Sequence, residues 1–536
     1  MRKRTTAWTR LVLITMPVIL LACAKRTEEG TSTDNTIPVT INISPTYQPP
    51  VFTDPERLEK IKSTFPEVDA IFRRHAEENN YPGLVYGIVV DDSLVFSGAT
   101  GLVNLDTGEP VTAESGFHIA SMTKSFTAMA ILKLRDERKL SLLDPVAKYI
   151  PGFAGQEYLS RDAPLVTIQN LMTMTSGFPE DNPWADRQLE DSDQEFMELI
   201  SGGLSFSNIP SYQYEYSNLG YAMLGTIINK VAGMPYQRYI TEEIFLPLGM
   251  TNTYWEYEEV PDNLLAQGYR WEEEQWKEEP MLHTGAFGAI GGMITSLNDF
   301  SKYVAFHLSA WPPRSDPETG PVKRSTVREM QVPTMPRLYA GATDAEGEPC
   351  PILSGYGYGL GIRKDCEGLT RVSHSGGLPG YGCEYRFFPD YGIGIISFSN
   401  RTYASTGQAN AEAMQVILEK SDIEPRAIPA SPILKKRTEQ VRALLNTWDE
   451  QLGEEILADN FYLDQSRKLR MKNAREVLEA AGVITAVDPL RPQNQLRGTF
   501  LMHGEQKDVQ VFFSLSPEKE PKVQALYLWN VEPGTD

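Results

Sequence analysis

The segment from Phe117 to Arg138 places the strictest limit on how this chain can fold. Its first residues are typical of a strand, and Ser125 to Arg138 repeats apolar residues at the spacing of a buried helix. Ser121 and Lys124 lie at the junction. Residues three apart on a helix share a face, so Lys124 can direct its ammonium group toward the Ser121 hydroxyl. The chain therefore has to bury a strand-to-helix connection that carries a serine beside a lysine.

Ser121 is a candidate nucleophile because of its predicted place on the first helical turn. Unpaired backbone N–H groups and the positive end of the helix dipole there favour negative charge on the serine. A lysine that loses water on burial shifts its pKa, so Lys124 can accept or shuttle a proton. A serine that only caps the helix is the alternative. The S-x-x-K pattern alone decides little, since Ser516 to Lys519 repeats it within a polar turn.

A second polar group, Tyr216-Ser217-Asn218, precedes the helical run Leu219 to Val231. A tyrosine hydroxyl close to an ammonium group can have its phenolate form stabilised, so Tyr216 is a candidate base toward the serine. Asn218 would offer an amide to a substrate carbonyl or to Lys124. The alternative is that Tyr216 only packs as an aromatic side chain at the start of the helix.

A third group, His374-Ser375-Gly376-Gly377, lies on a predicted strand that begins near Leu369. Small residues after the histidine let a substrate backbone approach the strand closely. The N–H of Gly377, together with that of Ser121, could then form an oxyanion hole. A nucleophile, a base and such a strand are the parts that acyl transfer requires.

With all three groups in this order, the chain resembles the serine β-lactamase and penicillin-binding-protein superfamily, in which S-x-x-K occurs with S-D-N and K-T-G. Y-S-N in place of S-D-N is similar to the branch of class C β-lactamases, D,D-peptidases and serine esterases. The resemblance covers about Pro66 to Lys420. Further matching stretches are Thr167 to Gly177, Ile244 to Met250, Gly291 to Met293 and Asn298 to Phe300.

The resemblance implies roles for seven residues. The implied catalytic residues are Ser121 as the acylated nucleophile, Lys124 as its proton partner and Tyr216 as the base. The implied substrate contacts are Asn218, His374, Ser375 and Gly377. His374 departs from the pattern, because it occupies the place of a lysine that holds a substrate carboxylate with a permanent charge.

We therefore expect a serine hydrolase that acts through an acyl-enzyme on a small amide, peptide or ester substrate, with a D-amino acid in the peptide as one form. Histidine at this position resembles D,D-peptidase, D-aminopeptidase and esterase-like members. A β-lactamase is one alternative. A catalytically silent penicillin-fold lipoprotein that binds or scaffolds is the alternative of another class. An α/β-hydrolase is disfavoured because Ser373, not glycine, stands two residues before Ser375.

The first residues are typical of an export signal. The basic stretch Met1 to Arg4 precedes an apolar run from Leu11 to Leu21, and Ala22-Cys23 completes a pattern similar to a bacterial lipobox. We expect residues 1–22 to be a lipoprotein signal peptide and Cys23 to carry acyl chains. An ordinary signal peptide or a short uncleaved anchor is the alternative. The protein would then be lipid-anchored in the bacterial cell envelope, exported and facing the periplasm or cell exterior.

Charge and metal-ligand spacing limit the partners. The formal net charge of −21 repels nucleic-acid phosphates, and no long Lys/Arg cluster follows the leader. The remaining cysteines show no CxxC or CxxH spacing and the six histidines are scattered, so we expect neither a metal nor a cofactor. A bridge between Cys350 and Cys366 stays open. The expected partners are a peptide or small-molecule substrate and, through the lipid, a membrane.

The length of 536 residues and the hydrophobic content of 41% predict two folded domains. The fold class is α/β in the α+β sense: an antiparallel sheet with flanking helices and a helical subdomain, followed by a small α+β domain. The predicted boundaries are 23–54 for a flexible tether, 55–421 for the hydrolase-like domain, 422–435 for a proline-rich linker and 436–536 for the accessory domain. Predicted elements include a helix from Pro55 to Asn79, a hairpin of Leu84 to Val90 with Leu94 to Ala99, helices at Lys435 to Asp459 and Asn473 to Ala481, and late strands at Leu496 to His503, Val509 to Leu515 and Val523 to Trp529.

Overall fold

A computed structural model describes residues 41–343 and 347–532. The predicted signal peptide, Cys23 and most of the predicted tether lie outside the described residues. By its contacts the chain divides after Pro45, and the unit from Thr46 onward holds all the elements given below.

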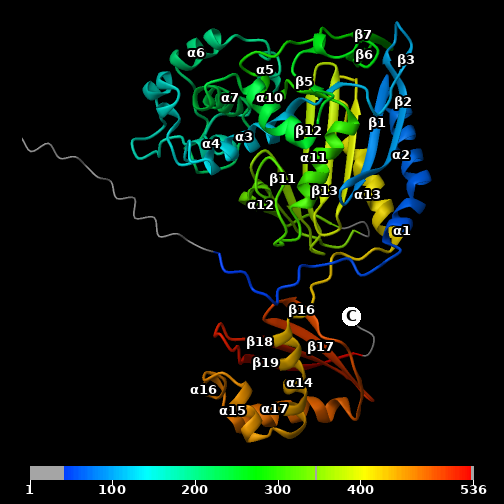
Figure 1. The fold of residues 1–536 in the computed structure, drawn as a ribbon, viewed down its shortest axis with the longest axis vertical. Helices are drawn as coiled ribbons and strands as arrows, with labels where there is room; N and C mark the ends of the chain where they lie inside the picture. Colours follow the sequence, from blue (N-terminus) through cyan, green and yellow to red (C-terminus); the bar gives the residue numbers. More distant parts are fainter. Residues whose placement is uncertain (1–40, 344–346, 533–536) are drawn as a thin grey trace, which may run out of the picture. The chain divides into compact units, whose positions relative to one another are not determined.

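The central element is a nine-stranded antiparallel sheet in the order β3-β2-β1-β14-β13-β12-β11-β10-β9 (Figure 1). The early hairpin pairs with a late strand, since Ile88 of β1 lies opposite Ile395 of β14. The predicted hairpin is present, with a second strand longer than expected. The bounds are β1 Gly83–Val90, β2 Ser93–Asn104, β3 Glu109–Pro110, β9 Thr334–Tyr339, β10 Ile352–Tyr356, β11 Gly361–Lys364, β12 Thr370–Leu378, β13 Tyr381–Phe388 and β14 Ile393–Ser399.

Three helices cover one face of this sheet: α1 Arg57–Ser63, α2 Phe65–Glu78 and α13 Gly407–Ser421 (Figure 1). The prediction of one helix from Pro55 to Asn79 is wrong in one respect, because the helix breaks at Thr64. Pro66 has no N–H to donate to α1, and a new helix begins at Phe65 with Pro66 in its first turn. Alternate residues of β1, such as Tyr86 and Ile88, pack into the resulting core.

The other face packs against α11 Leu297–Ser309 and a group of helices that the chain inserts between β4 and β9. The larger ones are α3 Lys124–Asp136, α4 Ile168–Met172, α6 Asp193–Ser201, α7 Asn218–Ala232, α8 Tyr236–Ile240 and α12 Arg324–Met330; the shorter ones are α5 Asn182–Ala185, α9 Leu246–Leu248 and α10 Gly288–Gly291. Small sheets join β4 Phe117–His118, β8 Ile294–Thr295 and β5 Thr253–Tyr254, and separately β6 Tyr269–Glu272 and β7 Gln275–Glu278. The predicted antiparallel sheet with flanking helices and a helical subdomain is confirmed.

The last part of the chain builds its own core from residues such as Val441, Phe461, Phe500 and Val511. A predicted single helix is two, since the chain leaves α14 at Trp448, whose φ is 50°. The three predicted strands are present as β17 to β19, and β15 and β16 extend their sheet. The bounds are α14 Pro432–Thr447, α15 Glu450–Ile456, α16 Phe461–Asp464, α17 Arg467–Ala481, β15 Ile484–Val487, β16 Arg491–Asn494, β17 Arg497–Gly504, β18 Asp508–Leu515 and β19 Val523–Val531.

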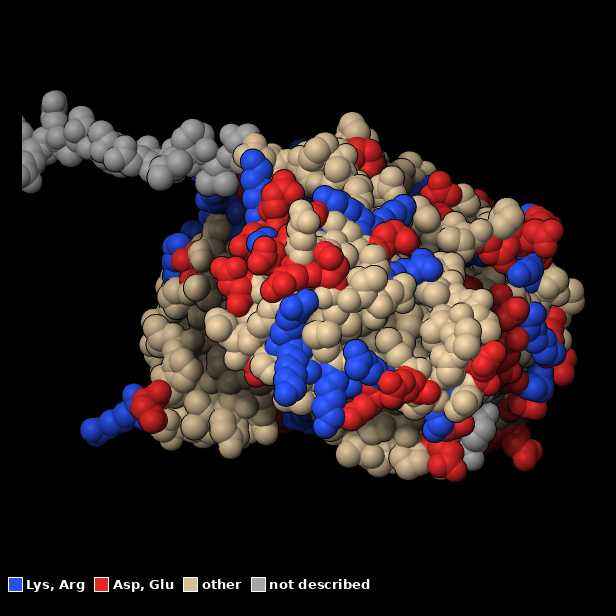
Figure 2. Space-filling model, turned by 90° about the horizontal axis from the view of Figure 1, so that it is seen from below, with Lys and Arg blue, Asp and Glu red and all other residues tan. Residues whose placement is uncertain are grey.

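A disulfide joins Cys350, just before β10, to Cys366, just after β11, while Cys383 is buried in β13 as a free thiol. The bridge ties together the outer ends of two paired strands. On the face that Figure 2 shows, basic and acidic side chains are interspersed. None of the described helices is both long and apolar enough to cross a membrane.

Candidate active site

Ser121 lies at a sharp connection between β4 and α3. It belongs to a 3-10 turn, Ala120–Thr123, directly before α3, rather than to the first turn of that helix as predicted. Ala120 has a φ of 49°, a conformation that turns the chain sharply and presents the next residue. β12 packs tightly on this connection, because a Cβ at Gly376 would lie 2.2 Å from the Ile119 carbonyl oxygen. The third sequence group and the first are therefore in direct contact.

Lys124 is fully buried and points at the serine. Its Nζ donates to Ser121 Oγ at 2.9 Å and to the Ile290 carbonyl oxygen at 2.9 Å. Burial lowers the pKa of Lys124 to about 7, although the Asp186 and Asp181 carboxylates oppose the shift. A lysine with such a pKa exchanges its proton readily near neutral pH.

Tyr216 joins the same pair. Both Tyr216 and Ser121 line the pocket, and Lys124 Nζ lies 5.3 Å from the centre of the Tyr216 ring. Burial raises the pKa of Tyr216 well above its ordinary value, and the nearby Ser121 side chain only partly offsets this. The phenolate form of Tyr216, which its proximity to Lys124 suggested, is thus disfavoured in the free protein. Lys124 is the stronger candidate base.

Asn218 lies beneath the site rather than in it. The residue is completely buried, its Nδ2 donates to Asn182 Oδ1 at 2.8 Å, and its backbone N–H donates to Asp181 at 2.7 Å. Asp181 also accepts from the N–H of Leu219 and so caps α7. The predicted amide of Asn218 reaches the site indirectly, by holding Asn182 at the pocket wall.

His374 is held as a neutral side chain. Its Nδ1 lies 2.6 Å from the Ser375 carbonyl oxygen, an acceptor, so Nδ1 carries the hydrogen and Nε2 accepts from the Tyr356 hydroxyl at 2.9 Å. Burial, with the Lys124 charge, lowers the pKa of His374 to about 3. The histidine therefore brings no positive charge to the place where the resemblance implied a lysine.

A pocket of about 670 Å³ opens above these groups. Of the predicted residues, Ser121, Tyr216, His374, Ser375 and Gly377 line it. Pairing between β11 and β12 ends at Ser373, so no described strand pairs with β12 beyond that residue on this side. The open edge gives a substrate backbone a strand to lie along, past the predicted oxyanion donors.

Several lining residues escaped the sequence reasoning: Asn182, Asp186, Tyr356, Arg363, Arg371 and Tyr403. One signal was present for Arg371, since Arg371, Ser373, Ser375 and Gly377 recur at every second position of β12, and alternate residues of a strand share a face. Asp186 lies in an acidic loop between Glu180 and Asp193. It is 5% exposed and accepts from the Tyr403 hydroxyl at 3.1 Å.

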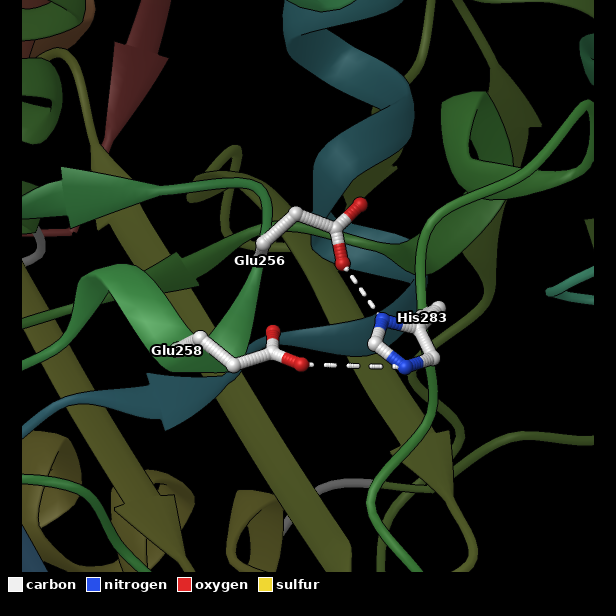
Figure 3. A group of neighbouring side chains, drawn as sticks. All are labelled: Glu256, Glu258 and His283. Carbon is white, nitrogen blue, oxygen red and sulfur yellow. Dashed lines mark hydrogen bonds and ion pairs between the residues drawn. The ribbon is translucent and has the colours of Figure 1, made fainter.

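One cluster outside the pocket has the composition of a metal site. Glu256, Glu258 and His283 bring their polar atoms together at the surface (Figure 3). However, Glu256 approaches Nδ1 of the imidazole at 2.9 Å and Glu258 approaches Nε2 at 3.7 Å, from opposite edges of the ring. The hydrogen bond that the His283 ring makes to the Glu256 carboxylate raises the pKa of His283, so the two carboxylates favour the charged form of the ring.

Sequence comparisons relate this chain to known proteins. The Beta-lactamase family model matches residues 68–419. Beta-lactamase-like protein 2 of Dictyostelium discoideum is 29% identical over 427 residues, which cover 77% of this chain and 73% of that protein. Penicillin-binding protein 4* of Bacillus subtilis (strain 168) is 26% identical over 432 residues, covering 77% of this chain and 87% of that protein.

Solved structures share the fold. An octameric penicillin-binding protein homologue from Pyrococcus abyssi, 22% identical, has a TM-score of 0.56 and covers 88% of this chain and 94% of its own. A class C beta-lactamase, 19% identical, has a TM-score of 0.53, and the match covers 67% of this chain and 96% of that chain. The predicted resemblance is confirmed: the chain belongs to the beta-lactamase family, within the superfamily of serine hydrolases that includes the penicillin-binding proteins.

Proposed function

We propose that the protein hydrolyses a small amide, peptide or ester substrate through an acyl-enzyme on Ser121. The observation that carries the proposal is the 2.9 Å contact of Lys124 Nζ with Ser121 Oγ, made by a lysine whose pKa burial lowers to about 7. Near neutral pH a large share of such a lysine is uncharged. It can then take the serine proton as the hydroxyl attacks.

In acylation, Ser121 Oγ bonds to the substrate carbonyl carbon while its proton moves to Lys124, directly or through the Tyr216 hydroxyl. The N–H groups of Ser121 and Gly377 hold the oxyanion, an effect of about 3 kcal/mol per donor in other serine enzymes. The C–N or C–O bond then breaks and the leaving group takes that proton. Water then attacks the ester carbonyl and gives a proton to the same base; the bond between that carbon and Ser121 Oγ breaks, Oγ takes the proton back, and the acid leaves.

A neutral His374 supports the ranking of ordinary amides and esters above β-lactam antibiotics. Its pKa of about 3 keeps it uncharged at any pH near neutrality. A neutral ring holds a carboxylate less well than a permanent cation does. Efficient β-lactam hydrolysis is the second candidate function, which the family membership favours.

Two measurements test the proposal. A fluorophosphonate probe should label the wild-type protein and leave Ser121→Ala unlabelled. Turnover of p-nitrophenyl esters and D-alanyl peptides should exceed that of a chromogenic cephalosporin. Rapid cephalosporin hydrolysis without ester or peptide activity would make this a β-lactamase, and an unlabelled folded protein would favour the silent scaffold.

We also propose that Cys23 carries the lipid and that the protein works at the membrane surface of the bacterial envelope, facing the periplasm or exterior. The proposal rests on the basic, apolar and small-residue order of residues 1–23. Labelled palmitate should be incorporated by the full chain and not by Cys23→Ser. Equal incorporation by both would contradict the anchor.

A further inference from the structure

The pocket lining includes charged side chains for which the mechanism has no use, among them Asp186, Arg363 and Arg371. None of these three forms an ion pair with a described residue, although Asp186 is only 5% exposed and Arg371 is partly buried, and a charge taken out of water is normally paired; Arg363 is exposed. Asp186 is acidic, whereas Arg363 and Arg371 are basic and lie on paired strands, β11 and β12. We propose, building on the proposed function, that the pocket binds a short zwitterionic peptide, with its ammonium group on Asp186 and its carboxylate on Arg363 and Arg371.

The Asp186 carboxylate lies at the end of the pocket that holds the proposed catalytic residues. Asp186 acts electrostatically on both Lys124 and Tyr216, and its one side-chain hydrogen bond among the described residues comes from Tyr403. Tyr403 in turn borders Gly377, where a Cβ would lie 2.7 Å from the tyrosine ring. An ammonium group bound to Asp186 therefore lies close to the carbonyl that Ser121 attacks.

Asp181, the neighbouring acid, is already engaged. Both of its carboxylate oxygens accept from the backbone N–H groups at the start of α7, at 2.7 and 2.9 Å. Burial raises the pKa of Asp186 to about 6, although the Lys124 charge and the Tyr403 hydroxyl oppose the shift. A substrate cation would supply the missing partner.

The basic group belongs to the opposite end. Arg363 of β11 and Arg371 of β12 are direct cross-strand partners. Like charges in that arrangement repel, which normally disfavours the pair. The carboxylate of Glu384 acts on Arg371 only from a distance, since it pairs with Arg386 at 2.8 Å and accepts from Asn410. Arg371 Nε is buried without a hydrogen-bond partner among the described residues. An anion between the two guanidinium groups would remove both defects.

The strand between the two ends sets the length of the ligand. Arg371 and Gly377 are ends of one pocket-facing row on β12, roughly 20 Å apart at their Cα atoms by the rise of a strand. An arginine side chain covers part of that distance. An extended peptide of three to five residues spans roughly 10 to 18 Å, so it can cover the remainder along the open edge of β12.

In this arrangement the protein removes the amino-terminal residue of a short peptide. Ser121 forms the ester with the first residue, the C–N bond to the second residue breaks, and the shortened peptide leaves with the proton from Lys124. Water then frees the first amino acid. Both charges of the substrate are recognised, one on each side of the bond that breaks.

The test uses an alanyl-glycyl-glycine peptide, with D- or L-alanine first, in free, N-acetylated and C-amidated forms. Acetylation and amidation should each lower kcat/KM of the wild-type protein at least tenfold. Asp186→Asn should shrink the acetylation effect to within about threefold, and Arg371→Gln should do the same for amidation. The exposed controls Asp162→Asn and Arg161→Gln should keep the wild-type discrimination.

Blocked and free peptides cleaved at equal rates by the wild-type protein would overturn the inference without any need for a variant. Discrimination that persists unchanged in folded Asp186→Asn and Arg371→Gln would overturn the assignment of the two ends. Fluorophosphonate labelling and ester turnover report the proposed function separately. Normal labelling with no charge preference refutes only this inference, whereas loss of labelling refutes both.

Discussion

Replacing Lys124 by arginine separates the charge of this side chain from its basicity. Burial lowers the pKa of Lys124 from 10.5 to about 7, so about half of the side chain is neutral at pH 7. A lysine with an unshifted pKa would be neutral in only about 0.03% of molecules at that pH, roughly a thousandfold less. Arginine keeps the positive charge and does not lose its proton in proteins. Lys124→Arg should therefore slow acylation of Ser121 by about a thousandfold.

The assay is the second-order rate of fluorophosphonate labelling, followed from pH 5 to 9. The wild-type rate should rise with pH and level off, with a midpoint near the pKa of Lys124, because only the neutral amine accepts the serine proton. Lys148→Arg, at an exposed lysine, serves as the matched control and should keep the wild-type profile. A folded Lys124→Arg protein that labels at the wild-type rate, with the same midpoint, would refute the role of this lysine as the base.

Three further predictions concern packing, pH and domain organisation. Gly376→Ala should reduce both labelling and the urea midpoint, since its Cβ would meet the Ile119 carbonyl oxygen at 2.2 Å. Gly108→Ala, where the Cβ meets nothing within 4 Å, is the control for labelling. Equal labelling of the two variants would contradict the packing. Burial lowers the pKa of His118 to about 4 and of His307 and His374 to about 3, so the unfolded chain binds more protons below pH 6.5. The free energy of unfolding should therefore be lower at pH 5 than above pH 6.5, by about 2 kcal/mol per histidine. A urea midpoint that rises on acidification would contradict this. Deletion of the residues after Pro432, which hold a separate core, should leave labelling largely intact, and complete loss in a folded truncation would show that they support the site.

Local spacing explains why part of the site could be predicted from the sequence. Ser121 and Lys124 meet because a helical turn fixes residues three apart, whatever the rest of the fold does. The small residues after His374 were equally informative, because only glycine fits against the Ile119 carbonyl. These features depend on a few neighbouring residues.

Long-range contacts explain what could not be predicted. Asp186 meets Tyr403 across 217 residues, and Arg363 meets Arg371 only through the register of two strands. Asn218 has the motif position of a substrate contact, yet its amide is turned to Asn182 because Asp181 captures the start of α7. Neither periodicity nor residue type carries that information. The state of Tyr216 also depended on burial, which raises its pKa where proximity to Lys124 alone suggested the opposite.

The central claim is that Ser121 becomes acylated, and mass spectrometric peptide mapping of the trapped protein tests it most directly. The protein is mixed with an ester or peptide substrate, quenched in acid during turnover, digested and mapped. The account predicts an acyl adduct on the peptide that contains Ser121, absent from Ser121→Ala and strongly reduced in Lys124→Arg. Turnover with an adduct on another residue, such as Ser375, or turnover that persists in Ser121→Ala, would contradict it.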